Sequence, residues 1–243
     1  MSITYSIFSD KGNREINEDS VGYIENINGS SCFVLCDGLG GHGMGDVASQ
    51  LVVSVIKEMF RDSDDSKKFI GTAFDAAQDC LISEQQKRNA KMKMKTTAVT
   101  VVIDNKKAYI GHVGDSRVYV FDKNSVRCRT LDHSIPQMLV LSKEIKDNEI
   151  RNHPDRNMLL KVMGIKWDEP QYETMKPIPL RKCQAFLLCS DGFWELIDET
   201  EMCSLLQNSQ SVEEWLHKMS AVVKLNGQGR NMDNYSAIAI WNK

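Results

Sequence analysis

Short runs of apolar and β-branched residues recur along the chain, and glycine, aspartate or asparagine bounds most of them. Runs of this length are typical of buried β-strands, because buried helices are longer. They predict strands over residues 32–36, 97–103, 108–113, 117–121, 185–189 and 236–241. Turn residues at 104–105 and 114–116 separate three of these runs, so we expect those three strands to form an antiparallel meander.

Four other segments repeat apolar residues at intervals of three and four, which is the spacing of one helix face. They cover residues 47–60, 69–81, 199–206 and 212–225. These helices come before and after the strands that are joined by tight turns. The order favours antiparallel sheets covered by helices over a parallel sheet built from βαβ units.

Composition excludes several classes of protein. The 243 residues contain no repeat, low-complexity tract or linker, so we expect a single domain over 1–243. A net charge of -3 with dispersed basic residues argues against a nucleic-acid partner. No leader-like N-terminus or apolar run of roughly 20 residues is present, so we expect a cytoplasmic protein without a membrane partner. The seven cysteines are an odd number, and we expect reduced thiols.

Aspartates recur where the predicted strands begin or end. They are Asp37, Asp115, Asp191 and Asp233. A single aspartate at a sheet rim is usually a turn former or a helix cap. Four carboxylates on one rim would repel one another unless cations lay between them. Hard divalent cations with oxygen ligands are the natural occupants, so the pattern predicts a metal centre.

A series of short motifs runs through nearly the whole chain. The motifs are SDKG at 9–12, REINED at 14–19, DGLGGHG at 37–43, GDSR at 114–117, DHS at 132–134, HPDRN at 153–157, SDG at 190–192 and DN at 233–234. In this order and spacing they resemble the type 2C, metal-dependent protein phosphatases, in particular the single-domain bacterial members. The resemblance implies an α+β fold, a four-layer α-β-β-α sandwich of two antiparallel sheets flanked by helices.

The resemblance also implies which residues hold metal. Asp37 would bridge two Mn²⁺ or Mg²⁺ ions, with the Gly38 carbonyl on one ion and Asp191 and Asp233 on the other. Asp115, together with Asp191, would serve a third and weaker site. The ion pair would lower the pKa of the water between the ions, so that a metal-bridged hydroxide attacks phosphorus.

Three further residues complete the expected site. Glu18 and Asp19 would hold metal-bound waters, and Arg14 would bind the substrate phosphate through two parallel hydrogen bonds. Arg14 and Asp37 are therefore the expected catalytic residues. Leu39 departs from the pattern, because some family members have a histidine there that is proposed as the general acid. The remaining histidines are expected to be structural, since such sites favour oxygen donors: His42, His112, His133 and His153.

The expected activity is that of a protein serine/threonine phosphatase acting on phosphoproteins. The resemblance suggests a monomer and a cognate serine/threonine kinase with the same targets. It also places a flap beside the metal centre at about residues 134–157, which we expect to be mobile and to govern substrate choice; an ordinary surface helix is the alternative. Two other functions stay open. They are an inactive relative that serves as a binding module, and a metal phosphoesterase acting on small metabolites.

Overall fold

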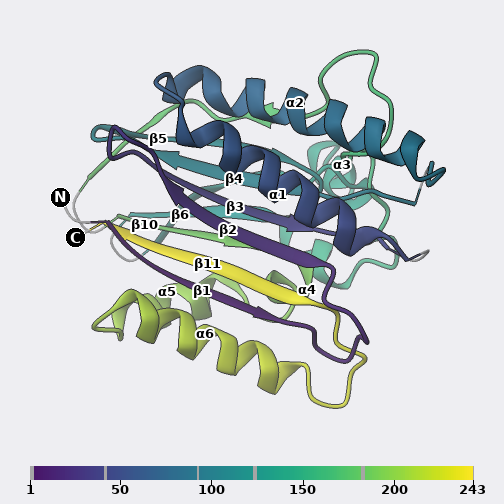
Figure 1. Cartoon of the computed structure of the whole chain (residues 1–243). Coiled ribbons are helices and arrows are strands. Elements are labelled where there is room, and N and C mark those ends of the chain that lie inside the picture. Colours follow the sequence, from purple (N-terminus) through teal and green to yellow (C-terminus); the bar gives the residue numbers. More distant parts are fainter. Residues whose placement is uncertain (1–2, 41–42, 92, 123–124, 182–183, 243) are drawn as a thin grey trace.

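The structure is a computed structural model that describes residues 3–40, 43–91, 93–122, 125–181 and 184–242. Its strands form two antiparallel sheets that lie face to face, and helices cover both outer faces (Figure 1). The predicted four-layer α-β-β-α sandwich is therefore confirmed. No helix within the described ranges is both long enough and apolar enough to cross a bilayer.

The first sheet has five strands in the order β1-β11-β10-β6-β7. Their bounds are Ile3–Asp10 for β1, Tyr235–Asn242 for β11, Gln184–Cys189 for β10, Arg117–Asp122 for β6 and Ser125–Arg129 for β7. β1 and β11 pair along their whole length, so the two ends of the chain lie beside each other. β10 is completely buried, which explains its unbroken apolar sequence.

The second sheet has the order β2-β3-β4-β5-β8, and a further short strand, β9, also pairs with β5. Their bounds are Asp19–Glu25 for β2, Ser31–Asp37 for β3, Ala98–Ile103 for β4, Lys107–Val113 for β5, Glu173–Thr174 for β8 and Ile178–Pro179 for β9. The predicted apolar runs thus form the central strands of this sheet. Its less apolar strands, β2 and β8, lie at the edges.

The predicted meander is wrong in its third strand. β4 and β5 pair as expected, but β6 lies in the other sheet, between β10 and β7. The turn at 114–116 therefore carries the chain from one sheet to the other. Turn residues indicate a change of direction but not the next pairing partner, and β8 and β9 take the edge of β5 instead.

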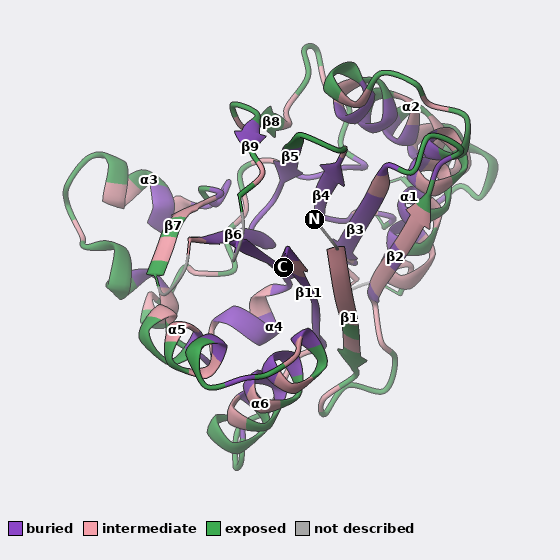
Figure 2. Cartoon of the chain, turned by 90° about the vertical axis from the view of Figure 1, so that its left-hand side faces the viewer, coloured by how far each residue is buried: buried purple, intermediate pink, exposed green. Residues whose placement is uncertain are grey.

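All four predicted helices are present. α1 (Gly45–Arg61) and α2 (Ser66–Lys87) pack on the second sheet, while α5 (Glu199–Gln207) and α6 (Val212–Asn226) pack on the first. A short helix, α4 (Asp191–Trp194), follows β10 directly. α3 (Ile135–Leu141) and the 3₁₀ helix Asp147–Asn152 lie beyond β7, within the predicted flap (Figure 2).

Three apolar layers hold the sandwich together. One lies between α1, α2 and the second sheet, one between the two sheets, and one between the first sheet and α4–α6. Buried residues accordingly fill the middle of the molecule, and exposed residues lie on the outer faces of the helices (Figure 2). The described cysteines are free thiols, and Cys32, Cys36 and Cys189 are buried in these layers.

Candidate metal centre and active site

The predicted aspartates meet at the end of the sandwich that lies away from both chain termini (Figure 1). Asp37 is the last residue of β3, and Asp191 is the first residue of α4, directly after β10. Asp233 precedes β11, and Asp115 lies in the turn between β5 and β6. Both sheets therefore contribute carboxylates to the same rim.

A cleft of about 450 Å³ opens between these strand ends. It is lined by Arg14, Glu18, Asp37, Gly38, Leu39, Gly40, Lys93, Lys95, Asp115, Asn157, Leu159, Asp191, Asp233 and Asn234. The structure thus brings together every candidate residue named from the sequence except Asp19. Gly41 and His42 of the glycine-rich motif lie outside the described residues.

The backbone of Asp37 is fixed by Thr96 and Thr97, the two residues directly before β4. Its N–H donates to Thr97 Oγ1 at 3.0 Å, and its carbonyl accepts from Thr97 N at 2.9 Å and Thr96 Oγ1 at 2.8 Å. The next residue must be glycine, because a Cβ at Gly38 would lie 2.3 Å from the Gly45 carbonyl oxygen. The backbone at the end of β3 is therefore held tightly, which limits where the Asp37 carboxylate can lie.

The loop between β1 and β2 brings Arg14 and Glu18 to the cleft, and Asn234 fastens this loop. Asn234 Oδ1 accepts from Glu18 N at 2.8 Å, and its Nδ2 donates to the carbonyls of Lys11 and Ile16, both at 3.0 Å. Arg14 Nη2 donates to Asp233 Oδ2 at 2.8 Å. No role for Asn234 was predicted, although its place directly after Asp233 in a matching motif was a signal.

Burial and mutual repulsion raise the pKa of the carboxyl groups in the cleft. For Asp37 burial is the larger cause and the charge of Asp191 the next, and the pKa lies well above its ordinary range. The same two causes raise the pKa of Asp115. Burial and the charge of Asp233 raise the pKa of Asp191 to about 6. Such a group of carboxylates is unfavourable without a compensating positive charge.

The donor set fits hard divalent cations. The cleft offers aspartate oxygens and the Gly38 carbonyl, which are the ligand types that Mg²⁺ and Mn²⁺ prefer, and no sulfur or imidazole donor lines it within the described ranges. A cation among Asp37, Asp115, Asp191 and Asp233 would also offset the repulsion that raises their pKa values.

Asp19 lies behind the cleft. It is opposite Asp37 in the β2–β3 register and is buried, and its Oδ2 accepts from Ser190 Oγ at 2.8 Å. Burial is the main cause that raises its pKa to about 7. Asp19 is not among the residues that line the cleft, and its predicted role through a metal-bound water stays a prediction.

Two lysines and a part of the predicted flap also line the cleft. Lys93 and Lys95 come from the segment that leads into β4, Asn157 is the last residue of the predicted flap, and Leu159 follows it. These residues were not among the sequence-based candidates. The repeated lysines at 91, 93 and 95 were the available signal, because they concentrate positive charge shortly before the predicted strand 97–103.

A second cluster of potential metal ligands lies outside the cleft. Ligand atoms of His112, His133 and Glu173 fall within 4.8 Å of one another, and the two imidazole rings stack with centroids 4.7 Å apart. His133 Nδ1 accepts the Gly114 N–H at 3.2 Å, so the neutral ring carries its proton on Nε2, which faces Glu173 Oε1 at 3.2 Å. His112 Nε2 lies 2.8 Å from the Leu131 carbonyl, while His112 Nδ1 and, apart from this contact with Glu173, His133 Nε2 are buried without a hydrogen-bond partner among the described residues. The structural role expected for these histidines stays a prediction.

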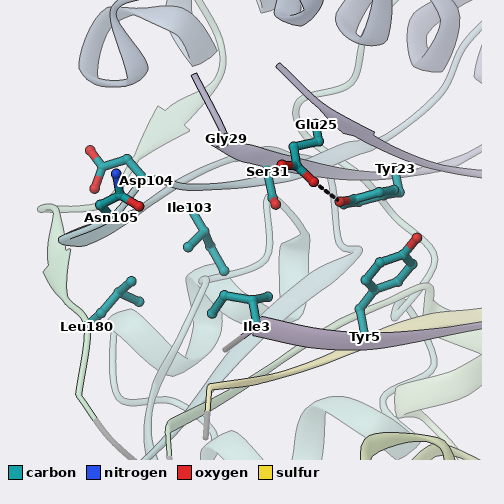
Figure 3. Close-up of a pocket in the computed structure, with 10 residues that line it drawn as sticks. All are labelled: Ile3, Tyr5, Tyr23, Glu25, Gly29, Ser31, Ile103, Asp104, Asn105 and Leu180. Atoms are coloured by element: carbon teal, nitrogen blue, oxygen red, sulfur yellow. Dashed lines mark hydrogen bonds between the residues drawn. The ribbon is translucent and has the colours of Figure 1, made fainter. Parts of the chain in front are cut away.

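A separate hollow lies at the opposite end of the space between the sheets (Figure 3). Tyr5 and Tyr23 stack on one side of it, with Ile103 on the other. The carboxylates here are engaged locally: Glu25 accepts from the Tyr23 hydroxyl, and Asp104 accepts two backbone N–H groups of its own turn. They do not converge as the cleft carboxylates do, so we place the active site at the cleft.

Comparisons with known proteins agree with this placement. The family described as Protein phosphatase 2C matches residues 9–233. The serine/threonine phosphatase Stp of Listeria welshimeri is 29% identical over 213 residues, which cover 85% of this chain and 84% of that protein. The crystal structure of the serine/threonine phosphatase Stp1 from Staphylococcus aureus is 28% identical with a TM-score of 0.90, over 100% of this chain and 96% of that one.

Proposed function

Because the chain belongs to the protein phosphatase 2C family, we propose that it hydrolyses phosphoserine and phosphothreonine in other proteins at the cleft between its two sheets. The predicted family and protein phosphatase class are confirmed by the match over residues 9–233. The observation that carries the proposal is the convergence of carboxylates from both sheets with Arg14 and two lysines in one cleft. These groups suit a dianionic phosphate together with its metal ions.

Two divalent cations, Mn²⁺ or Mg²⁺, are assigned to Asp37, the Gly38 carbonyl, Asp191 and Asp233, and a third and weaker site to Asp115 with Asp191. The all-oxygen donor set and the raised pKa values of Asp37 and Asp191 support this assignment. When bound, such cations act as Lewis acids on the phosphate and lower the pKa of a coordinated water. Glu18 and Asp19 are assigned to hydrogen bonds with water in the metal shell.

The chain's own residues would orient and neutralise the substrate. Arg14 is half exposed at the cleft mouth, where its guanidinium can form two parallel hydrogen bonds with phosphate oxygens. Its present partner, Asp233, is one of the assigned metal ligands, so a cation on Asp233 would release Arg14 for the phosphate. Lys93 and Lys95 add positive charge on the β4 side of the cleft. Leu39 has no proton to give, so the leaving oxygen must take its proton from water or another residue.

Phosphoproteins are the substrates that family membership implies. A cognate kinase, a monomeric state, a single domain over 1–243 and a cytoplasmic location stay predictions. The inactive-relative alternative loses support, because each assigned carboxylate lines the cleft or lies directly behind it. The alternative of a phosphoesterase for small metabolites requires a direct test.

The test compares phosphate release from phosphothreonine, phosphoserine and phosphotyrosine peptides with release from nucleotide and sugar phosphates, all with added Mn²⁺. We expect the phosphoserine and phosphothreonine peptides to be hydrolysed with the highest kcat/KM. Asp191→Ala is the control, and it should remove turnover of every substrate. A higher kcat/KM for a nucleotide or sugar phosphate would overturn the proposed substrate class, and no turnover of any substrate would favour the inactive relative.

A further inference from the structure

The indole of Trp194 is buried directly behind the cleft and is bonded to one of the assigned metal-site residues. Its Nε1–H donates to the backbone carbonyl of Asp115 at 3.0 Å. Trp194 is the last residue of α4, and the first residue of the same helix is Asp191. One side chain therefore connects the helix that begins with Asp191 to the turn that holds Asp115.

The orientation of this indole is fixed by charged groups. The Arg117 guanidinium carbon lies 3.4 Å from the ring centroid, which is a close cation–π contact. Arg117 is itself clamped in the core, because its Nε and Nη2 donate to the two carboxylate oxygens of Asp132 at 2.8 and 2.6 Å. A ring stacked on a guanidinium that a bidentate ion pair holds in place has little freedom to turn its N–H away from Asp115.

The backbone of α4 is held from the predicted flap. Arg151, in the 3₁₀ helix, donates from Nε to the Trp194 carbonyl at 3.0 Å and from Nη2 to the Ile197 carbonyl at 3.2 Å. The same guanidinium donates to Glu199 Oε1 at 2.9 Å. Trp194 is therefore fixed through its ring by Arg117 and through its main chain by Arg151.

The turn that holds Asp115 depends on such outside support. It crosses between the sheets and is therefore not part of a hairpin ladder. Gly114 has a φ of +100°, and its N–H and carbonyl bond to His133. The Ser116 hydroxyl lies 2.8 Å from Thr97 Oγ1. The carbonyl of Asp115 itself is bonded by the Trp194 indole.

We propose that Trp194 is a positioning residue for the metal centre. Through its bond to Asp115 and its place in the helix that begins with Asp191, it holds these two residues in the relative position that the third and weaker cation site requires. This inference rests on the proposed function, because it takes Asp115 and Asp191 to be metal ligands. Trp194 itself touches neither cation nor substrate. Its effect on the site is carried by the single hydrogen bond to the Asp115 carbonyl and by the shared helix.

Trp194→Phe tests the proposal, and the chain offers a matched control. Trp215 is equally buried, and its Nε1–H donates to the Met202 carbonyl at 3.1 Å in the layer between α5 and α6. Trp215→Phe therefore removes the same kind of bond away from the cleft. Calorimetric titration with Mn²⁺ should show that the weakest binding event is weakened about 10-fold in Trp194→Phe, as is typical when a residue supporting a metal ligand is lost, and is unchanged in Trp215→Phe.

A measurement on the unaltered protein covers the case in which Trp194→Phe does not fold. Diamagnetic Mg²⁺ is titrated into ¹⁵N-labelled protein while the indole N–H resonances are followed. The Trp194 resonance should shift as the last cation binds, and the Trp215 resonance should stay in place. The positioning role would be overturned if the weakest Mn²⁺ binding event had the same affinity in both folded variants. It would also be overturned if the Trp194 indole resonance did not shift when Mg²⁺ binds. Absence of any Mn²⁺ or Mg²⁺ binding by the unaltered protein would instead contradict the proposed function.

Discussion

Asp37 is the residue around which the candidate site is arranged. It ends a central strand of the second sheet, its backbone is bonded to Thr96 and Thr97, and its carboxylate lies near those of Asp191 and Asp115. Its raised pKa shows that the protein alone does not favour the negative charge there. A cation would reverse that preference, which is why we assign Asp37 the bridging position.

Asp37→Asn separates the role of this charge from the role of the fold. The amide has nearly the same shape, but it cannot replace an anionic bridge between two cations, so kcat should fall at least about 100-fold with saturating Mn²⁺. In excess chelator the variant should melt at or above the temperature of the unaltered protein, because one repelling charge has been removed. Phosphate release and thermal unfolding measure the two effects. Turnover equal to that of the unaltered protein would contradict the bridging assignment.

At the scale of elements, the crossing turn between β5 and β6 connects the sheets beside the cleft. Gly114 takes a left-handed conformation with φ +100°, and a Cβ there would lie 2.5 Å from Thr97 Cγ2. The turn thus requires glycine both for its backbone angle and for its close approach to Thr97, the residue directly before β4. This requirement places Asp115 at the rim of the cleft.

Gly114→Ala should destabilise the fold more than the backbone angle alone explains. Gly229 provides the matched control, since it has φ +76° but no atom within 4 Å of an added Cβ. We expect the free energy of unfolding to fall by about 2 kcal/mol more in Gly114→Ala than in Gly229→Ala, because overpacking adds to the strained φ. Urea unfolding in chelator measures the difference. Equal losses in the two variants would show that the crossing turn can relax.

The predicted flap contains α3 and the 3₁₀ helix Asp147–Asn152, and its last residue, Asn157, lines the cleft. The charged segment 143–149 is mostly exposed, whereas Arg151 beyond it is anchored to α4. The segment that we expect to be mobile, 143–149, is therefore distinct from Arg151, the residue that holds the flap to α4. The predicted influence of the flap on substrate choice can therefore be tested with Arg151 itself left in place, although the replacement includes the first residues of its 3₁₀ helix.

Replacing residues 143–149 by a short Gly/Ser turn should change kcat/KM among phosphopeptides far more than kcat/KM for a small aryl phosphate. The reason is that a peptide extends beyond the cleft, while the assigned metal ligands all lie outside the replaced segment. Paired assays of a set of phosphothreonine peptides and the aryl phosphate measure the two effects. An equal effect on both substrates, or none on either, would favour the alternative of an ordinary surface helix.

Across the whole molecule, the strands and helices that could be predicted from the sequence are those whose apolar residues form a continuous pattern. β3, β10 and the helices α1 and α6 follow from such patterns, and the motif resemblance named the carboxylates that line the cleft. The half-buried edge strand β1 and the two-residue strands β8 and β9 have no comparable pattern. The pairing of β6 and the contacts of Asn234 and Trp194 depend on which distant segments meet, and local sequence does not encode that information directly.

The two sheets meet the cleft from opposite sides, with Asp37 on one and Asp191 and Asp233 on the other. We infer that divalent cations held between these carboxylates are required for the hydrolysis of phosphoproteins. The most direct test is phosphate release from a phosphothreonine peptide, first after dialysis against excess chelator and then during stepwise addition of Mn²⁺. We expect no turnover in chelator and full recovery as the ions bind. Full turnover that persists in chelator would contradict this inference.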